Sequence, residues 1–250
     1  MKKTIFITGA TSGIGKATAE VFAKQGHRLI ICGRRKEVLD NLQIQLSNFT
    51  DVYSLVFDVR NQQEVQNAIN SLPEEWKNID VLVNNAGNAH GLEPISDANI
   101  SDWDAMMDGN VKGLLYVSQP IIKLMKANNS GHIVNISSVA ARQTYANGTV
   151  YCASKKAVDV ISEGMRLELT EFGIKVTNVQ PGAVETDFSK VRFKGDEERA
   201  ATVYAGYEPL IAEDIADAIS YCVNAPDRVS IAEICIYPKM QAEPRTIYKK

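Results

Sequence analysis

The chain has 250 residues, enough for one large α/β domain, and its apolar share of 45% and charged share of 23% are close to the averages for soluble globular proteins. Its formal net charge is −3 and it has no block of consecutive basic residues, which excludes an electrostatic footprint for nucleic acid or an anionic membrane and favours a small-molecule partner. A division into two domains remains an open alternative.

The cysteines and the hydropathy pattern exclude two further classes. The four cysteines are far apart, and neither a C-x-x-C pair nor histidines at metal-ligand spacing accompany them, so we expect no metal site and no disulfide framework. No run of 18 or more apolar residues occurs, and the apolar stretch near the N-terminus is too short for a secretory signal. These features predict a cytoplasmic protein with reduced thiols.

In chain order, short β-branched runs alternate with segments of helical period. KTIFIT, RLIICG and DVYSLVFDV are each followed by such a segment: IGKATAEVFAKQG, KEVLDNLQIQL and NQQEVQNAINSL. The second half continues with IDVLVNN, a long helical stretch from Ile100 to Asn128, GHIVNIS, a helix from about Tyr151 to Phe172, IKVTNVQ, a helix near Ala212 to Val223, and SIAEICIY.

This order predicts a parallel sheet built from right-handed crossovers. The strands are nearly continuous apolar runs, as expected when helices cover both faces. We therefore predict a single Rossmann-like, doubly wound domain of about seven strands over residues 1–250. Residues 183–211 form an unusually long connection after a strand, which is typical of a lid over a ligand site, and a tail begins at about residue 239.

The first predicted turn between strand and helix is TGATSGIG, with glycines at Gly9, Gly13 and Gly15. Glycines in such a turn let a pyrophosphate approach the backbone, and the helix N-terminus offers unpaired N–H groups to the anion. Thr11 and Ser12 add hydroxyl donors, and Ile14 lies within the same turn. A glycine-rich turn that serves only packing is the alternative, because the pattern alone is weak.

The second strand ends in Gly33 followed by Arg34 and Arg35, with no acidic residue there. An acidic residue at this point binds the ribose 2′-hydroxyl of NAD, whereas arginine accommodates the 2′-phosphate of NADP. The sequence therefore favours NADP. The alternative is a solvated helix start, although two cations near a helix N-terminus oppose its dipole.

The strongest chemical pattern follows the strand GHIVNIS. Ser138 ends that region, Tyr151 opens the next helix thirteen residues later, and Lys155 follows one helical turn after Tyr151. An ammonium close to a phenol favours the phenolate, so we expect Lys155 to lower the pKa of Tyr151 and make it a useful acid/base. Taken singly, each residue has an ordinary alternative, such as a surface Tyr/Lys pair or a serine cap.

Together, the glycine turn and the S-x12-Y-x3-K arrangement resemble the short-chain dehydrogenase/reductase family over nearly the whole chain. The resemblance implies that Tyr151 exchanges a proton with the substrate oxygen, Ser138 hydrogen-bonds that oxygen, Lys155 binds the nicotinamide ribose, and Asn110 supports a proton-relay water. It also implies a homotetramer, with the two long helices at an interface. The further cofactor contacts that it implies are Asp58, Val59, Asn85, Ala86, Gly87, Pro181, Gly182, Val184 and Thr186.

A narrower resemblance concerns the substrate. EWKNIDVLVNNAG, GLEP, the DW pair and VRFKGD are similar to the NADP-dependent 3-hydroxy acid dehydrogenases, which implies substrates such as L-serine, L-allo-threonine or 3-hydroxypropionate. A carboxylate substrate needs a cation in the site, and Arg192, with Lys194 as a second candidate, is our prediction. A reductase for bulkier ketones or diketones, and a regulator that binds NADP(H) without turnover, are the alternatives.

Overall fold

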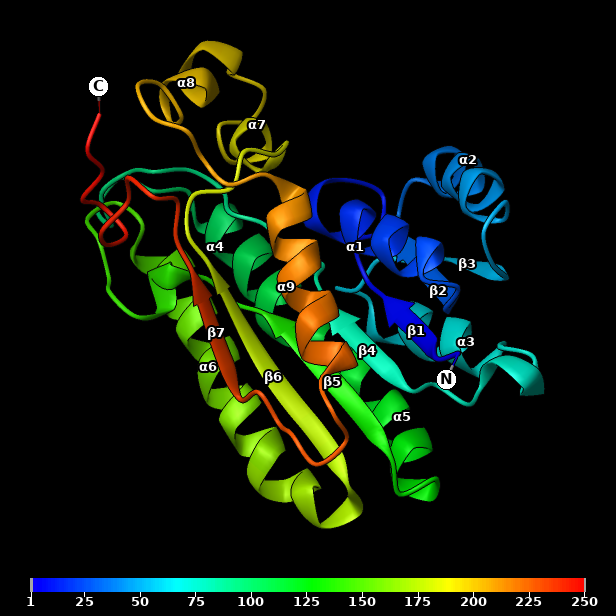
Figure 1. Ribbon diagram of the computed structural model, residues 1–250. Helices are drawn as coiled ribbons and strands as arrows, with labels where there is room; N and C mark the ends of the chain where they lie inside the picture. The colour runs from blue at the N-terminus through cyan, green and yellow to red at the C-terminus, as the bar shows by residue number, and fades with distance from the viewer. Residues whose placement is uncertain (1, 250) are drawn as a thin grey trace.

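The computed structural model describes residues 2–249 as a seven-stranded sheet in the order β3-β2-β1-β4-β5-β6-β7, with every neighbouring pair parallel (Figure 1). This confirms the predicted fold class. The strands are β1 (Thr4–Ile7), β2 (Arg28–Gly33), β3 (Val52–Val56), β4 (Val81–Asn84), β5 (Gly131–Ile136), β6 (Ile174–Pro181) and β7 (Glu233–Ile236).

Helices cover both faces of the sheet, which is why the central strands are apolar on both sides. One core lies beneath α1 (Gly13–Lys24), α2 (Lys36–Leu46) and α9 (Ala212–Asn224), and it contains Phe22 and Ile31. The other core lies beneath α3 (Gln62–Asn70), α5 (Gly113–Ala127) and α6 (Thr149–Leu169). Strand order reverses between β1 and β4, so the carboxyl ends of β1, β4, β5 and β6 converge where such folds bind ligands.

The predicted helix from Ile100 to Asn128 is interrupted in the structure. It consists of α4 (Ile100–Met107), a π-helical turn at Asp108–Lys112, and α5. A π turn inserts one extra residue into the helical path, and such turns occur frequently at functional sites. The helix predicted to end at Phe172 ends as α6 at Leu169, and one 3-10 turn then continues to Phe172 before Gly173 adopts a left-handed conformation with φ 67°.

Two segments lie over the carboxyl edge of the sheet. Residues 183–211 contain α7 (Phe188–Arg192) and α8 (Glu197–Thr202). Figure 1 shows these two helices above the N-terminal end of α9. The chain after β7 folds back towards the same edge, where the Gln241 Oε1 accepts a hydrogen bond from the Ala183 amide at 2.9 Å. The tail and the 183–211 segment therefore contact each other.

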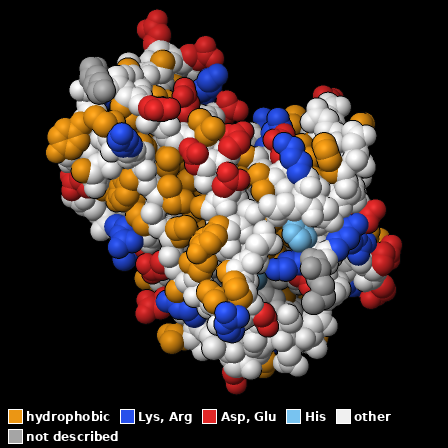
Figure 2. Space-filling view, in the orientation of Figure 1, with side chains coloured by type: hydrophobic (Ala, Val, Ile, Leu, Met, Phe, Trp, Pro, Cys, Tyr) orange, Lys and Arg blue, Asp and Glu red, His pale blue; other side chains and the backbone are white. Residues whose placement is uncertain are grey.

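The surface and the described helices agree with the composition. Acidic and basic side chains are interspersed on the face shown in Figure 2, without a continuous basic stripe. Within residues 2–249, no helix has both the length and the apolar character needed to cross a membrane. The same residues contain no cluster of His, Cys, Asp and Glu side chains arranged to hold a metal ion.

Candidate active site

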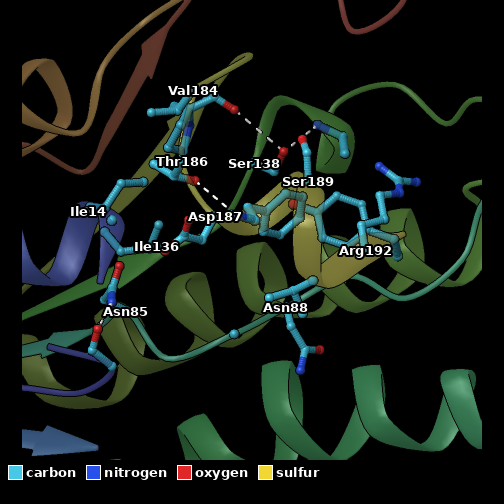
Figure 3. Close-up of a pocket in the computed structure, with 18 of the residues that line it drawn as sticks. Ile14, Asn85, Asn88, Ile136, Ser138, Val184, Thr186, Asp187, Ser189 and Arg192 are labelled. Atoms are coloured by element: carbon cyan, nitrogen blue, oxygen red, sulfur yellow. Dashed lines mark hydrogen bonds between the residues drawn. The ribbon is translucent and has the colours of Figure 1, made fainter. Parts of the chain in front are cut away.

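A cavity of about 780 Å³ opens along the carboxyl ends of the central strands. In Figure 3, Ile14 and Asn85 lie at one end of this cavity, and Arg192 lies at the other, with Ser138 and Thr186 between them. All but two of the predicted site residues line the cavity: Gly15 lies in the adjoining turn, and Asn110 lies behind the cavity. The lining residues that were predicted are Gly9, Thr11, Ser12, Gly13, Ile14, Arg34, Arg35, Asp58, Val59, Asn85, Ala86, Gly87, Ser138, Tyr151, Lys155, Pro181, Gly182, Val184, Thr186 and Arg192.

The β1–α1 turn has the geometry of an anion cradle. Gly13 has φ +50°, and a Cβ atom on Gly15 would lie 2.3 Å from the Gly9 carbonyl oxygen, so no larger residue fits at Gly15 without a shift. Ser12 precedes the first helical residue in an extended conformation, and its side chain makes no capping hydrogen bond to the helix. The turn has no acidic residue that would oppose a phosphate.

Asn85 holds this turn against the end of β4. The Nδ2 of its side chain donates to the carbonyl oxygens of Thr8 and Gly9 at 3.0 and 3.2 Å. Its backbone N–H donates to the Thr8 hydroxyl at 3.0 Å. Asn85 was predicted as a cofactor contact, and these bonds show that it also fixes the shape of the glycine turn.

The two arginines after β2 have different partners. The Arg35 guanidinium donates to the Thr11 hydroxyl at 2.9 Å, which joins the arginine to the glycine turn. Arg34 lies 3.6 Å from the Asp58 carboxylate. A third cation, Arg60, forms a bidentate pair with Asp58, with Nε 3.0 Å from each carboxylate oxygen. The hydrogen bonds and charge of Arg60 outweigh burial and lower the pKa of Asp58, so its carboxylate stays ionised.

Tyr151 and Ser138 meet in the middle of the cavity, where both side chains are buried. The Ser138 hydroxyl accepts a hydrogen bond from the Ala140 amide at 3.1 Å, which fixes its position at the end of β5. Burial raises the pKa of Tyr151 above its ordinary value, and the Ser138 hydroxyl and the Arg192 charge only partly oppose this effect. The predicted lowering of the Tyr151 pKa by Lys155 is therefore wrong for this structure, because desolvation dominates.

Lys155 lies on the same face of α6, one turn beyond Tyr151. Its Nζ donates to the Ile136 carbonyl oxygen at 3.0 Å, so the amine is held by the end of β5. Burial lowers the pKa of Lys155 to about 8, and the Asp159 carboxylate opposes this shift. The amine is thus mostly charged at neutral pH.

Asn110 lies in the π-helical turn and is buried behind the cavity. Its side chain accepts a hydrogen bond from the Asn88 amide at 2.8 Å and donates to the Asn88 carbonyl at 2.8 Å and to the Ser154 hydroxyl at 3.0 Å. Asn110 thereby connects the loop after β4 to α6, next to Tyr151 and Lys155. Its predicted support of a proton-relay water stays a prediction.

Arg192 forms the far end of the cavity. Its Nε donates to the Gly91 carbonyl oxygen at 3.1 Å, and its NH1 donates to the Tyr145 hydroxyl at 3.2 Å. Its NH2 is buried and has no hydrogen-bond partner among the described residues. Its guanidinium carbon lies 5.5 Å from the centre of the Tyr151 ring. Lys194, the second candidate, instead forms an ion pair with Asp102 at 2.9 Å and does not line the cavity.

The family assignment follows from comparison with known proteins. Residues 3–197 match the family model described as short chain dehydrogenase. The chain belongs to the short-chain dehydrogenase family. This confirms the resemblance inferred from the glycine turn and from Ser138, Tyr151 and Lys155.

Among relatives in this family, the NADP-dependent 3-hydroxy acid dehydrogenase YdfG of Salmonella typhi is 41% identical over 239 residues, covering 95% of this chain and 96% of the relative. The NADP-dependent 3-hydroxy acid dehydrogenase of Schizosaccharomyces pombe is 38% identical over 251 residues, covering 99% and 97%. A solved structure described as the closed form of serine dehydrogenase complexed with NADP+ superposes with a TM-score of 0.93 at 39% identity, covering 99% of each chain.

Several cavity residues of this short-chain dehydrogenase were not predicted. Arg60 follows Asp58 by two residues, and its charge next to this predicted cofactor contact was an available signal. Tyr145 and Phe188 close the substrate end, where the Phe188 ring centre lies 5.7 Å from that of Tyr151. Arg245 reaches the cavity from the tail. Only the tertiary fold brings these last three side chains to the cavity, so the local sequence gave no signal for them.

Proposed function

We propose that the protein is an NADP-dependent oxidoreductase that interconverts the hydroxyl group of small 3-hydroxy acids and the corresponding carbonyl. The observation that carries this proposal is that Tyr151, Ser138 and Lys155 line one cavity that continues to the glycine turn and its arginines. The NADP dependence and 3-hydroxy acid activity named for relatives of nearly the same length support it.

The residues around the glycine turn fit an NADP molecule. The turn would hold the pyrophosphate, because glycine lets the phosphates approach and the N-terminus of α1 favours an anion. Arg34 and Arg35 would bind the 2′-phosphate, since no acid follows β2 that could repel it. The remaining predicted contacts near Asp58 and after β4 and β6 would complete the site. NADP accepts or returns a hydride when it is bound.

Tyr151 would take the proton of the substrate hydroxyl during oxidation and return it during reduction. Ser138 would donate a hydrogen bond to the same oxygen and hold it at the phenol. Lys155 would bind the nicotinamide ribose, because its amine lines the cavity, is held by the Ile136 carbonyl oxygen and is mostly charged at neutral pH. Asn110 would keep the Tyr151 end of α6 in register through Ser154.

Arg192 would recognise the substrate carboxylate. Its buried NH2 lacks a partner among the described residues, and an unpaired charged donor in a cavity favours an anionic ligand. The two hydrogen bonds to Gly91 and Tyr145 orient the guanidinium beside Tyr151. The segment 183–211, which carries Arg192, would act as a lid over bound substrate.

The test is an assay of absorbance at 340 nm with NADP and with NAD, against L-serine, 3-hydroxypropionate and neutral alcohols. We expect turnover with NADP and a preference for the acids. Arg192→Gln should raise the KM for the acids about 10- to 100-fold, because a charge-assisted hydrogen bond contributes about 1.5–3 kcal/mol, while turnover of a neutral alcohol changes little. A preference of the wild-type protein for neutral diketones would favour the broad reductase, and NADP binding without turnover would favour the regulator.

A further inference from the structure

Asp159 is a largely buried carboxylate that the proposed chemistry does not use. It lies on α6 one turn beyond Lys155, and its side chain is only 11% exposed. Burying a carboxylate is unfavourable unless hydrogen bonds and a cation compensate for the lost solvation. The surroundings of Asp159 supply both, which indicates a specific role for this side chain.

Three neutral side chains donate to the Asp159 carboxylate. Ser137 at the end of β5 donates to Oδ1 at 2.7 Å, and Asn178 of β6 donates to the same oxygen at 2.8 Å. Gln180 of β6 donates to Oδ2 at 3.2 Å, and its own Oε1 accepts from Arg142 at 2.8 Å. These bonds join α6 to the carboxyl ends of β5 and β6. Ser138 follows β5, and Pro181 is the last residue of β6.

The same network reaches Lys155 directly. The Ser137 hydroxyl, which donates to Asp159, also lies 3.0 Å from the Lys155 carbonyl oxygen. The Lys155 amine donates to the Ile136 carbonyl oxygen one residue before Ser137. The Lys155 amine is therefore held by the last residue of β5, its carbonyl oxygen contacts the Ser137 hydroxyl just after that strand, and Asp159 anchors Ser137 from α6.

Few charged groups surround the buried amine. The titratable groups of α6 in this region are Tyr151, Asp159 and Lys156. Burial keeps Tyr151 neutral, and the exposed Lys156 amine lies 3.8 Å from the Asp159 carboxylate. The facing ends of β5 and β6 present neutral side chains, Arg142 is separated from Asp159 by Gln180, and the π-helical turn presents the neutral Asn110. Asp159 is the charge that opposes the effect of burial on the pKa of Lys155.

We infer that Asp159 is a positioning residue, which locks the Lys155 turn of α6 to the ends of β5 and β6. Its negative charge lies one helical turn beyond Lys155 on the same helix. The inference rests on the proposed function in one respect, the binding of the cofactor ribose by Lys155. It goes beyond that function, because Asp159 does not line the cavity and would act only through Lys155 and Ser137.

The experiment measures the dissociation constant of NADPH between pH 6 and pH 10, from the fluorescence increase on binding, for the wild-type protein and Asp159→Asn. Affinity falls where Lys155 loses its proton, since an uncharged amine is a weaker ligand. Asp159→Asn removes the stabilising charge, so we expect this fall to move to lower pH by about half a unit or more. Exposed Glu163, one turn further along α6, provides the control: Glu163→Gln should leave the curve unchanged.

A second variant separates charge from packing and serves if Asp159→Asn does not fold. Asp159→Glu keeps the charge but disturbs the three hydrogen bonds, so the melting temperature of this variant should drop. Its affinity for NADPH should still fall at about the same pH as that of the wild-type protein. The inference would be overturned if the affinity of Asp159→Asn for NADPH fell at the same pH as that of the wild-type protein. It would also be overturned if the affinity of Asp159→Glu fell at a lower pH than that of the wild-type protein. Failure of the wild-type protein to bind NADPH would instead overturn the proposed function on which it rests.

Discussion

At the scale of single residues, Arg35 connects the nucleotide prediction to an observed contact. Its guanidinium donates to Thr11 in the glycine turn, so it lies where, in the proposed function, the 2′-phosphate of NADP would bind. The position is informative because a charged donor discriminates between a ribose hydroxyl and a ribose phosphate.

We predict that Arg35→Gln weakens NADPH binding about 10-fold or more, since charge-assisted hydrogen bonds contribute about 1.5–3 kcal/mol. NADH binding should change less than 3-fold, because NADH lacks the phosphate. Fluorescence titration with both nucleotides measures this, and Lys36→Gln at the neighbouring exposed position is the control. Equal losses for NADPH and NADH would contradict the role of Arg35 in selecting the phosphate.

The residue scale also separates what the sequence could predict from what it could not. Ser138, Tyr151 and Lys155 were identified because their spacing places them at a strand end and on one helix face, and the structure brings all three to one cavity. The pKa of Tyr151 was predicted with the wrong direction, because spacing reveals a neighbouring charge but not the depth of burial. Tyr145 approaches Tyr151 through the fold alone and had no local pattern.

At the scale of elements, the β1–α1 turn combines folding and binding in the same glycines. The Gly9 carbonyl oxygen and the Asn85 amide lie so close to Gly15 that a Cβ atom there would be 2.3 and 2.4 Å from them. The carbonyl is backbone and cannot move without distorting the turn. The absence of a side chain at Gly15 is therefore what lets β1, α1 and β4 approach one another at this turn.

We predict that Gly15→Ala lowers the melting temperature by several degrees and weakens NADPH binding more than 10-fold, because overpacking costs about 1–3 kcal/mol. Gly164→Ala in α6 is the matched control: no neighbouring atom lies within 4 Å of its added Cβ, so it should be neutral or slightly stabilising. Differential scanning fluorimetry gives the comparison. Equal melting temperatures for the two variants would contradict the close approach described for the turn.

The elements show a second limit of prediction. The alternation of strands and helices followed from hydrophobic periodicity, and burial on both sheet faces explains the apolar strands of the parallel sheet. The π-helical turn at Asp108–Lys112 did not, because one extra residue in a helix barely changes that periodicity. It nevertheless carries Asn110, so the irregular part of the helix is the part that matters at the site.

At the scale of the whole molecule, His132 couples stability to pH. Burial lowers its pKa from 6.5 to about 3, so the folded protein keeps the imidazole neutral while the unfolded chain binds a proton below about pH 6.5. The neutral imidazole contributes its full share to the free energy of unfolding above about pH 6.5. This contribution is lost as the pH falls below that value, by up to about 1.4 kcal/mol per pH unit. Urea unfolding of wild type and His132→Asn at pH 7.5 and pH 5 should show a smaller loss in the variant. Equal losses would contradict the neutral, buried histidine.

The homotetramer is also a prediction at this scale. Leu167 and Val160 on α6 are 79% and 59% exposed, and Leu115 on α5 is 41% exposed, so the two helices predicted at an interface carry accessible apolar side chains. Light scattering after size exclusion should give about four times the chain mass of 27.5 kDa. Leu167→Asp should give smaller species, whereas Ile44→Asp on α2, which is 69% exposed, should not. A wild-type monomer would contradict the prediction.

The most direct test of the account is Tyr151→Phe, because it removes one oxygen atom from a side chain that is already buried. The measurement is oxidation of L-serine or 3-hydroxypropionate at 340 nm, together with the dissociation constant of NADPH. We predict that turnover falls at least about 1,000-fold while NADPH affinity stays within about 3-fold of wild type, since the phenol exchanges the proton and the nucleotide is held elsewhere. Turnover close to that of the wild-type protein would contradict the account.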